Sequence, residues 1–210
     1  MDDTLVAGNT GFYASLRLVR HGILKKRRIP QAVYYRLANL FFPQDVRKIY
    51  EIAVADMAGT PLDTILTIGR ECLERDIRKR LYPEGIRLIE QHRSAGDQTI
   101  LLTSGPYMII EPLREFFGVD RAYSSGPVIE NGILQNRLRL PLCFGEGKLF
   151  YAGQAAAELG VKLGDCTFYS NDLHDLPLLE KIGRPVATNP DKRLERIARQ
   201  RGWEILSLRD

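Results

Sequence analysis

Short apolar segments alternate with helical segments in the second half of the chain, and this alternation constrains the fold more than any other feature. The pattern predicts strands at 99–103, 121–124, 166–169 and 185–187. Apolar side chains at three- and four-residue spacing predict helices at 84–93, 108–117, 148–159 and 192–200. Such alternation is typical of an α/β fold, in which a mostly parallel sheet carries helices on both faces.

The preceding part of the chain has a helical pattern throughout. From Gly11 to Arg80 apolar residues recur every three or four positions, and Pro30, Pro43 and Pro61 divide the pattern into several short helices. A block of helices placed before alternating strands indicates an inserted cap. We therefore predict a helical cap formed by residues 11–80 and an α/β core formed by residues 1–10 and 81–210. Within that core, Asn131-Gly132 predicts a β-hairpin turn.

Length and composition fit a globular protein with a self-sufficient core. The 210 residues are enough for one domain with a modest insertion, and the 44% hydrophobic and 27% charged residues are ordinary for this class. A net charge of +4, from 30 basic and 26 acidic side chains, is compatible with an anionic ligand but too small for a nucleic-acid-binding surface. We expect no nucleic acid among the partners.

Cysteine usage and hydropathy bear on the compartment. Cys72, Cys143 and Cys166 are odd in number and widely spaced, which favours three buried thiols over a disulfide framework or a zinc site. No segment reaches the roughly 20 apolar residues that span a bilayer, and the acidic start is unlike a signal peptide. We therefore expect no membrane span and a cytoplasmic location.

Four polar clusters stand where the predicted topology would place a ligand site, at the carboxyl ends of strands. They are Asp2-Asp3-Thr4, Thr103-Ser104-Gly105, the segment from Gly145 to Lys148 and the segment from Ser170 to Asp175. Each cluster alone is as easily a helix cap or a solvated loop. Together they supply carboxylates, a hydroxyl, a lysine and an acidic loop, which are the groups that phosphoryl transfer uses.

These clusters resemble the four motifs of the haloacid dehalogenase superfamily, and in particular its phosphoserine-phosphatase-like branch, which has a helical cap after the first strand. Motif one, Asp-x-Asp-x-Thr, matches Met1 to Thr4 from its second position onward. Motif two matches Leu102 to Gly105, motif three matches Gly145 to Lys148, and motif four with its sequel matches Phe168 to Glu180. The resemblance implies a Rossmann-like core and hydrolysis of a phosphate monoester.

The resemblance also implies roles for individual residues. The catalytic residues would be Asp2 as general acid and base, Ser104 as a donor to a phosphoryl oxygen, and Lys148 as a balancing charge. The residues implied in substrate binding are Thr4, Asn9, Gly105 and His174. The implied cofactor is Mg²⁺, with a ligand set of Asp2, Asn171, Asp172 and Asp175. The implied partner is a small phosphorylated metabolite, and the oligomeric state stays open.

Three positions depart from the family pattern. The nucleophilic aspartate of motif one would stand one residue before Met1, after a strand from the middle of the sheet, so we expect Met1 to be an internal residue of a longer motif. Asn171 stands where the family has its first metal-binding acid, and an amide carries no charge. Asn9 stands where phosphoserine phosphatases have a glutamate that engages the substrate ammonium, which argues against phosphoserine as the substrate.

These departures leave more than one hypothesis open. The leading hypothesis is a magnesium-dependent phosphatase that acts through an aspartyl phosphate, with the nucleophile just upstream of Met1. The alternative is a catalytically inactive phosphate-binding or regulatory protein, which Asn171 favours. A third, weaker hypothesis is a polyanion-binding module that uses the basic run from Lys25 to Arg28, although a solvated face of the cap explains that run better.

Overall fold

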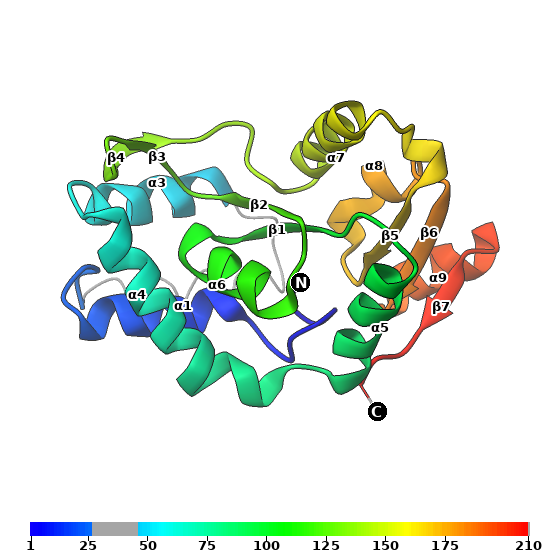
Figure 1. The fold of residues 1–210 in the computed structure, drawn as a ribbon, viewed down its shortest axis with the longest axis horizontal. Helices are drawn as coiled ribbons and strands as arrows, with labels where there is room; N and C mark the ends of the chain where they lie inside the picture. The colour runs from blue at the N-terminus through cyan, green and yellow to red at the C-terminus, as the bar shows by residue number, and fades with distance from the viewer. Residues whose placement is uncertain (27–45, 210) are drawn as a thin grey trace.

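Strands and helices alternate in the second half of the protein, as the computed structural model of residues 1–26 and 46–209 shows (Figure 1). The strands are β1 (Ile100–Pro106), β2 (Arg121–Ser125), β5 (Thr167–Ser170), β6 (Arg184–Thr188) and β7 (Glu204–Leu206). The helices among them are α5 (Pro83–Ser94), α6 (Tyr107–Phe117), α7 (Glu146–Leu159), α8 (Leu176–Leu179) and α9 (Lys192–Arg201). The α/β fold predicted from the sequence is confirmed, with small shifts at the ends of elements.

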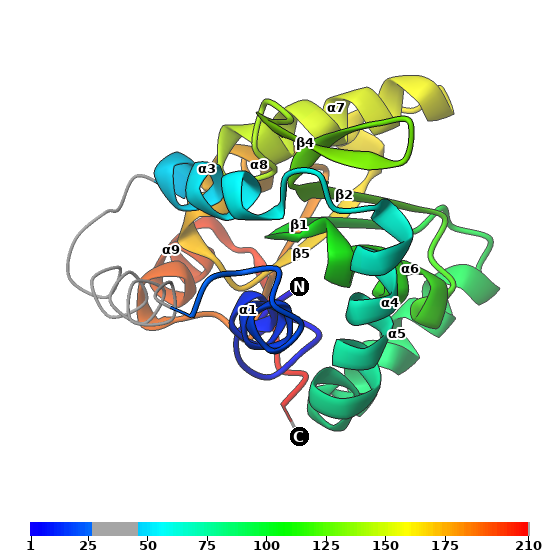
Figure 2. The ribbon, with the colours of Figure 1, turned by 90° about the vertical axis from the view of Figure 1, so that its left-hand side faces the viewer.

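The parallel strands form two sheets within the described ranges. β1 pairs with β2, with Ile100 opposite Arg121, while β6 lies between β5 and β7. β1 and β5 belong to different sheets, and the N-terminus lies near both of them (Figures 1 and 2). A Cβ added to Gly105 in β1 would lie 3.2 Å from the Met1 side chain, which places Met1 beside the carboxyl end of β1.

In the described part of residues 10–80, helices alternate with short turns. The helices are α1 (Thr10–Arg20), α3 (Val46–Met57) and α4 (Leu62–Cys72), and α4 continues through a π-helical turn (Leu73–Ile77) and a 3-10 turn (Arg78–Arg80). Residues 27–45, with Arg27, Arg28, Pro30 and Pro43, lie outside the described residues. Of the basic run, Lys25 is 3.4 Å from the Asp56 carboxylate and thus has an acidic partner within the same molecule.

The predicted hairpin is confirmed, and it packs against a helix of the first part of the chain. β3 (Pro127–Glu130) and β4 (Ile133–Leu138) are antiparallel, and Asn131 and Gly132 join them with φ values of 51° and 73°. Positive φ at both central residues is the geometry that an Asn-Gly turn supplies. The chain between α3 and α4 is hydrogen-bonded to β4, so α3 lies along the hairpin (Figures 1 and 2).

Apolar side chains form two clusters. The larger joins the helices to β1 and α6 and includes the fully buried Ile77, Ile109 and Leu113. The smaller lies between β6 and α9 and consists of Leu179, Ala187, Leu194 and Ala198. Burial of each large aliphatic side chain stabilises the fold by about 1.5 to 3 kcal/mol.

All three cysteines are free thiols. Burial raises the pKa of Cys72 to about 12 and that of Cys143 to about 11, so both stay protonated at neutral pH. Cys166 is only half-buried, so the expectation of three buried thiols is wrong for this residue, which follows the surface turn at Leu163–Asp165. Within residues 1–26 and 46–209, no helix combines the length and the apolar character needed to cross a bilayer.

Candidate active site

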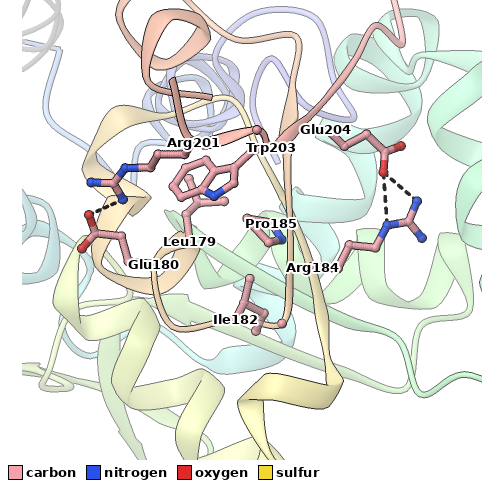
Figure 3. A pocket seen from close by; sticks show the side chains of 10 residues that line it. Leu179, Glu180, Ile182, Arg184, Pro185, Arg201, Trp203 and Glu204 are labelled. Carbon is pink, nitrogen blue, oxygen red and sulfur yellow. Dashed lines mark hydrogen bonds and ion pairs between the residues drawn. The ribbon is translucent and has the colours of Figure 1, made fainter. Parts of the chain in front are cut away.

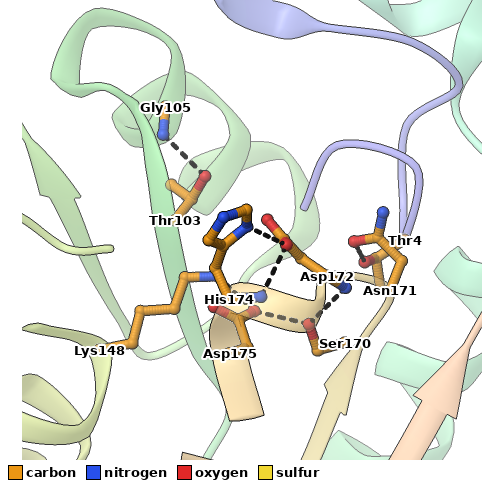
Figure 4. Close-up of polar contacts among 9 residues, drawn as sticks. All are labelled: Thr4, Thr103, Gly105, Lys148, Ser170, Asn171, Asp172, His174 and Asp175. Atoms are coloured by element: carbon orange, nitrogen blue, oxygen red, sulfur yellow. Dashed lines mark hydrogen bonds and ion pairs between the residues drawn. The ribbon is translucent and has the colours of Figure 1, made fainter. Parts of the chain in front are cut away.

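A buried ion pair between Lys148 and Asp175 forms the centre of the candidate site (Figure 4). Lys148 lies in the first turn of α7, and Asp175 lies in the loop after β5, directly before α8. Lys148 Nζ is 2.6 Å from Asp175 Oδ2, and the Ser170 hydroxyl donates to the same oxygen at 2.5 Å. The Lys148 and Asp175 side chains are 8% and 2% exposed. Because desolvation of two charges is costly, a pair this deeply buried needs such additional hydrogen bonds.

A close backbone contact fixes the start of α7. Gly147 lies against Leu142, and a Cβ on this glycine would be 1.7 Å from the Leu142 carbonyl oxygen. The Tyr151 hydroxyl, one turn after Lys148, donates to the Pro141 carbonyl at 2.8 Å. The segment before the helix and the first turns of the helix therefore hold Lys148 in place.

The second oxygen of Asp175 has no partner among the residues that the structure describes. Asp175 Oδ1 is buried and accepts no hydrogen bond from them. A buried carboxylate oxygen without a donor is energetically costly, and a cation is a partner of the right chemistry. Asp175 therefore fits the predicted role of a metal ligand.

The other predicted metal ligands of motif four, Asn171 and Asp172, have hydrogen-bond partners within the protein. Asn171 Oδ1 accepts a hydrogen bond from the buried Thr4 hydroxyl at 3.0 Å, which leaves its second lone pair for another partner. The Asp172 carboxylate turns to His174, accepting from its backbone N–H at 2.9 Å and contacting ring Nδ1 at 2.8 Å. In the described part of the chain, no three His, Cys, Asp or Glu side chains are grouped to hold a metal ion.

Asp2 lies on the N-terminal side of the site and is held by the first residue of α1. The Thr10 hydroxyl donates to Asp2 Oδ1 at 2.7 Å, and the Thr10 N–H donates to Oδ2 at 3.2 Å. Burial raises the Asp2 pKa above its ordinary value, and the ammonium group of Met1 opposes this rise. Burial, and after it the charge of Lys148, lower the pKa of the Met1 amino group, against the opposing charges of Asp2 and Asp175.

The carboxyl end of β1 supplies Ser104 and Gly105. The Gly105 N–H, which was expected to bind a phosphoryl oxygen, donates instead to Thr103 Oγ1 at 2.9 Å (Figure 4). Ser104 is half-buried. Ser125, at the end of the neighbouring strand β2, is buried and accepts from the Cys143 N–H at 3.0 Å.

Two residues predicted to bind substrate have structural partners instead. Asn9 is exposed and caps the N-terminus of α1, where its side-chain oxygen accepts from the Phe12 N–H at 2.8 Å. The His174 ring is 63% exposed, contacts Asp172, and lies 4.9 Å from the ring centre of Phe144. An N-cap role follows from ordinary helix chemistry, and it occupies the oxygen that would otherwise face a ligand.

Two residues of the site region, Thr10 and Ser125, are absent from the sequence motifs. Ser125 follows a predicted strand directly, so its place at a carboxyl end could have been found from the strand pattern. Thr10 carries no comparable signal, because its role depends on the fold of the segment after Asp2.

A larger hollow lies at the opposite end of β6 (Figure 3). Its volume is about 750 Å³, and its walls include Leu179, Pro185 and Trp203. Its charged side chains are paired, Arg184 with Glu204 at 2.6 Å and Arg201 with Glu180. Because open parallel sheets bind ligands at the carboxyl ends of their strands, this hollow beside the start of β6 is not the candidate site.

A smaller pocket of about 490 Å³ lies at the carboxyl end, next to the motif-four loop. Its lining includes Asn171 and Asp172 of that loop and, from other segments, Asp3, Asn189, Lys192 and Arg209. Asn189 donates to the Asp3 carbonyl at 2.9 Å and thereby ties the loop after β6 to the N-terminal segment. The pocket therefore lies next to the candidate site, between the motif-four loop and the start of α9.

Known proteins share both the sequence and the fold of this chain. Curated relatives include phosphoserine phosphatase SerB1 of Mycobacterium tuberculosis, 29% identical over 100% of this chain and 69% of the relative. Histidinol-phosphatase of Neisseria meningitidis serogroup C is 31% identical over 79% of this chain and 76% of the relative.

Solved structures agree with these relatives. A protein with unknown function from Bordetella pertussis Tohama I has a TM-score of 0.86 at 27% identity, with 99% of this chain and 96% of that chain covered. A substrate-bound phosphoserine phosphatase has a TM-score of 0.69 at 14% identity over 99% of this chain and 90% of its own, which shows a shared fold. Residues 1–180 match the haloacid dehalogenase-like hydrolases. The chain belongs to this family of hydrolases.

Proposed function

We propose that this hydrolase is a phosphatase that acts on a small phosphorylated metabolite with Mg²⁺ as its cofactor. The observation that carries the proposal is the buried pair of Lys148 and Asp175, in which the second carboxylate oxygen has no donor among the described residues. An acid, a cation and an unpartnered carboxylate oxygen are the groups that phosphoryl transfer uses. The phosphatases named among the relatives support the same reaction class.

The nucleophile in this proposal is an aspartate joined to the nitrogen of Met1. Met1 lies against Gly105 at the carboxyl end of β1, so a residue attached to its nitrogen would lie near the candidate site. Its carboxylate would attack phosphorus and form an aspartyl phosphate, and water would then release phosphate from that ester.

Asp2 and Lys148 have separate parts in this reaction. Asp2 would give a proton to the departing alcohol and later take one from the attacking water, and its raised pKa favours the protonated form needed first. Lys148 would balance the negative charge on the phosphoryl oxygens and the nucleophile. Ser104 would donate a hydrogen bond to one of these oxygens.

Asp175 Oδ1 and the Asn171 amide oxygen would hold the magnesium ion, whose charge would neutralise phosphoryl oxygens. The Asp2 carboxyl, which accepts from Thr10 and carries the proton in the first step, would not be a ligand in that form. Asp172 would take part only if its carboxylate turned away from His174. The unpartnered oxygen of Asp175 supports this assignment, because it lacks a donor among the described residues.

The substrate is proposed only as a class. Asn9 is neutral and caps α1, which disfavours recognition of the phosphoserine ammonium by this residue. Phosphoserine and histidinol phosphate, the compounds in the names of two relatives, are therefore tested together with sugar phosphates and p-nitrophenyl phosphate. We also propose a cytoplasmic location, in keeping with the free thiols.

Expression from the native gene, with any residues encoded before Met1, tests this function. Intact mass identifies the residue attached to Met1, and we expect an aspartate there. The purified protein is then assayed with the substrate panel, with and without magnesium. A protein that binds phosphate but hydrolyses none of these esters would instead be the inactive phosphate-binding protein, the alternative that Asn171 favours.

A further inference from the structure

Thr10, the first residue of helix α1, donates two hydrogen bonds to the carboxyl group of Asp2. The Thr10 hydroxyl donates to Oδ1 at 2.7 Å, and the backbone N–H donates to Oδ2 at 3.2 Å. Thr10 is 0% exposed, so water does not compete with its hydroxyl for the carboxyl group. Because a carboxylate oxygen can accept two hydrogen bonds, each oxygen of Asp2 keeps one lone pair for a proton or a reacting group.

The Thr10 hydroxyl lies at the carboxyl end of β1, the strand end that supplies the proposed donor to the phosphoryl group. A Cβ added to Gly105 of β1 would lie 3.5 Å from Thr10 Oγ1. Two residues after Asp2, the Thr4 hydroxyl donates to Asn171 Oδ1 of the motif-four loop at 3.0 Å. The segment that carries Asp2 is therefore held between β1 and the motif-four loop, and Thr10 fixes the direction of its carboxyl group.

Contacts along helix α1 fix Thr10 in turn. The Asn9 side chain caps the start of the helix, where it accepts from the Phe12 N–H at 2.8 Å. Further along the helix, Arg17 Nε donates to the carboxylate of Asp76 in the π-helical turn at 2.6 Å. Because both hydrogen bonds to Asp2 come from one residue of an anchored helix, the position of α1 decides how the Asp2 carboxyl group is turned.

We infer that Thr10 is a positioning residue that orients Asp2 for proton transfer to the departing alcohol. The inference rests on the proposed phosphatase function, in which Asp2 is the general acid. It gives α1, a helix of the predicted cap, a part in the chemical step, because this helix would aim the proton donor without touching the substrate.

Thr10→Val tests this role, because valine is close to threonine in shape and lacks the hydroxyl. The protein expressed from its native gene is assayed with magnesium on phenyl phosphate and on p-nitrophenyl phosphate. Phenolate needs a proton as it departs, whereas p-nitrophenolate is stable enough to leave without one. We expect kcat/KM to fall about 100-fold for phenyl phosphate and less than about fivefold for p-nitrophenyl phosphate.

Two further variants serve as controls. Thr10→Ser retains the hydroxyl, so kcat/KM for phenyl phosphate should stay within about threefold of the parent value. Ser15→Ala removes a hydroxyl from the same helix, but this hydroxyl donates to the Gly11 carbonyl at 2.8 Å. Its kcat/KM should stay within about twofold of the parent value for both substrates, since Asp2 keeps its two donors.

The dependence on the leaving group decides the outcome. Equal falls of kcat/KM for the two substrates in Thr10→Val would overturn the inference, because a general structural defect does not depend on the leaving group. Unchanged values for both substrates would overturn it too, as would a Thr10→Ser protein no more active than Thr10→Val. If Thr10→Val does not fold, Thr10→Ala, which also lacks the hydroxyl, is measured in its place.

A parent protein without phosphatase activity would overturn the proposed function instead. The orientation of Asp2 is then tested by crystal structures of the parent and of Thr10→Val. We expect the carboxyl group of Asp2 to turn away from its parent direction in the variant. The same direction in both structures would overturn the inference.

Discussion

Two buried cations, Arg17 and Lys148, differ in how fully their partners are satisfied. Arg17 of α1 donates from Nε and Nη2 to both oxygens of Asp76, at 2.6 and 3.0 Å, and from Nη1 to Glu71 at 2.6 Å. Lys148 binds one oxygen of Asp175, and the other oxygen has no donor among the described residues. The two cationic side chains are almost equally buried, at 9% and 8% exposure.

This difference distinguishes a structural ion pair from a candidate catalytic pair. The Arg17 network ties α1 to the end of α4 and the π-helical turn, and its two carboxylates are 29% and 22% exposed, so water reaches them. The Lys148 pair keeps an unsatisfied oxygen where a cation and a phosphate are proposed to bind. Loss of Lys148 should therefore reduce activity most, whereas loss of Arg17 should reduce stability most.

Lys148→Met should have the largest effect. Removing a charge that stabilises the phosphoryl oxygens is expected to lower kcat by about 10³-fold. The assay uses the protein from its native gene with magnesium and p-nitrophenyl phosphate, and circular dichroism checks that the variant is folded. Arg17→Met, assayed well below its unfolding temperature, should keep kcat within about threefold of the parent value. A folded Lys148→Met protein with nearly full activity would contradict the assignment of Lys148.

Arg17→Met should have the next largest effect, on the free energy of unfolding. Asp76 and Glu71 would lose their common cation, which lowers the free energy of unfolding. Urea unfolding measures the change. Arg17→Lys should recover part of the loss, because a lysine keeps the charge but cannot donate to both carboxylates in the same fork geometry. Equal stability of the parent and Arg17→Met would show that the network contributes nothing.

Substitution of two glycines by alanine tests the same distinction between a structural contact and a contact near the candidate catalytic lysine, with a smaller expected effect. A Cβ at Gly147 would lie 1.7 Å from the Leu142 oxygen, and a Cβ at Gly69 in α4 would lie 1.9 Å from the Met108 oxygen. Alanine at either position should lower the free energy of unfolding by about 2 kcal/mol, because backbone must move. Only Gly147→Ala should also lower kcat, since Lys148 is the next residue. If Gly69→Ala lowered kcat of the folded enzyme equally, the effect would not be local to the site.

Much of this fold could be predicted because its signals are local. The strand at 99–103 and the helix at 148–159 follow from periodicity alone, and the Asn131-Gly132 turn follows from the tolerance of these residues for positive φ. The sequence motifs also predicted that Lys148 and Asp175 would lie in one site, and the two side chains meet at 2.6 Å.

The rest depends on contacts between segments far apart in the chain. Helix α3 packs on a hairpin more than 70 residues later, and no local pattern contains this contact. Asn9 was predicted to face a ligand, but the Phe12 N–H at the start of α1 donates to its side-chain oxygen. The Gly105 N–H similarly finds Thr103 within its own strand. Local competition for hydrogen bonds therefore decides which polar residues remain available to a ligand.

Acid titration should show the smallest effect and should depend on the Arg17 network. The hydrogen bond from Arg17 is the main cause that lowers the Asp76 pKa below its ordinary value of 3.8, and the His21 contact, followed by the charge of Arg17, lowers the pKa of Glu71. Because folding lowers both pKa values, the folded state binds fewer protons than the unfolded state. The Asp76 and Glu71 carboxylates therefore stabilise the fold above about pH 4, and they lose that contribution as the pH falls through their folded pKa values. Urea unfolding between about pH 5 and about pH 3 should show a steeper loss of stability for the parent than for Arg17→Met, because the variant no longer holds Asp76 in its charged form. Parallel pH profiles would mean that other carboxylates govern acid unfolding and that Arg17 contributes through packing alone.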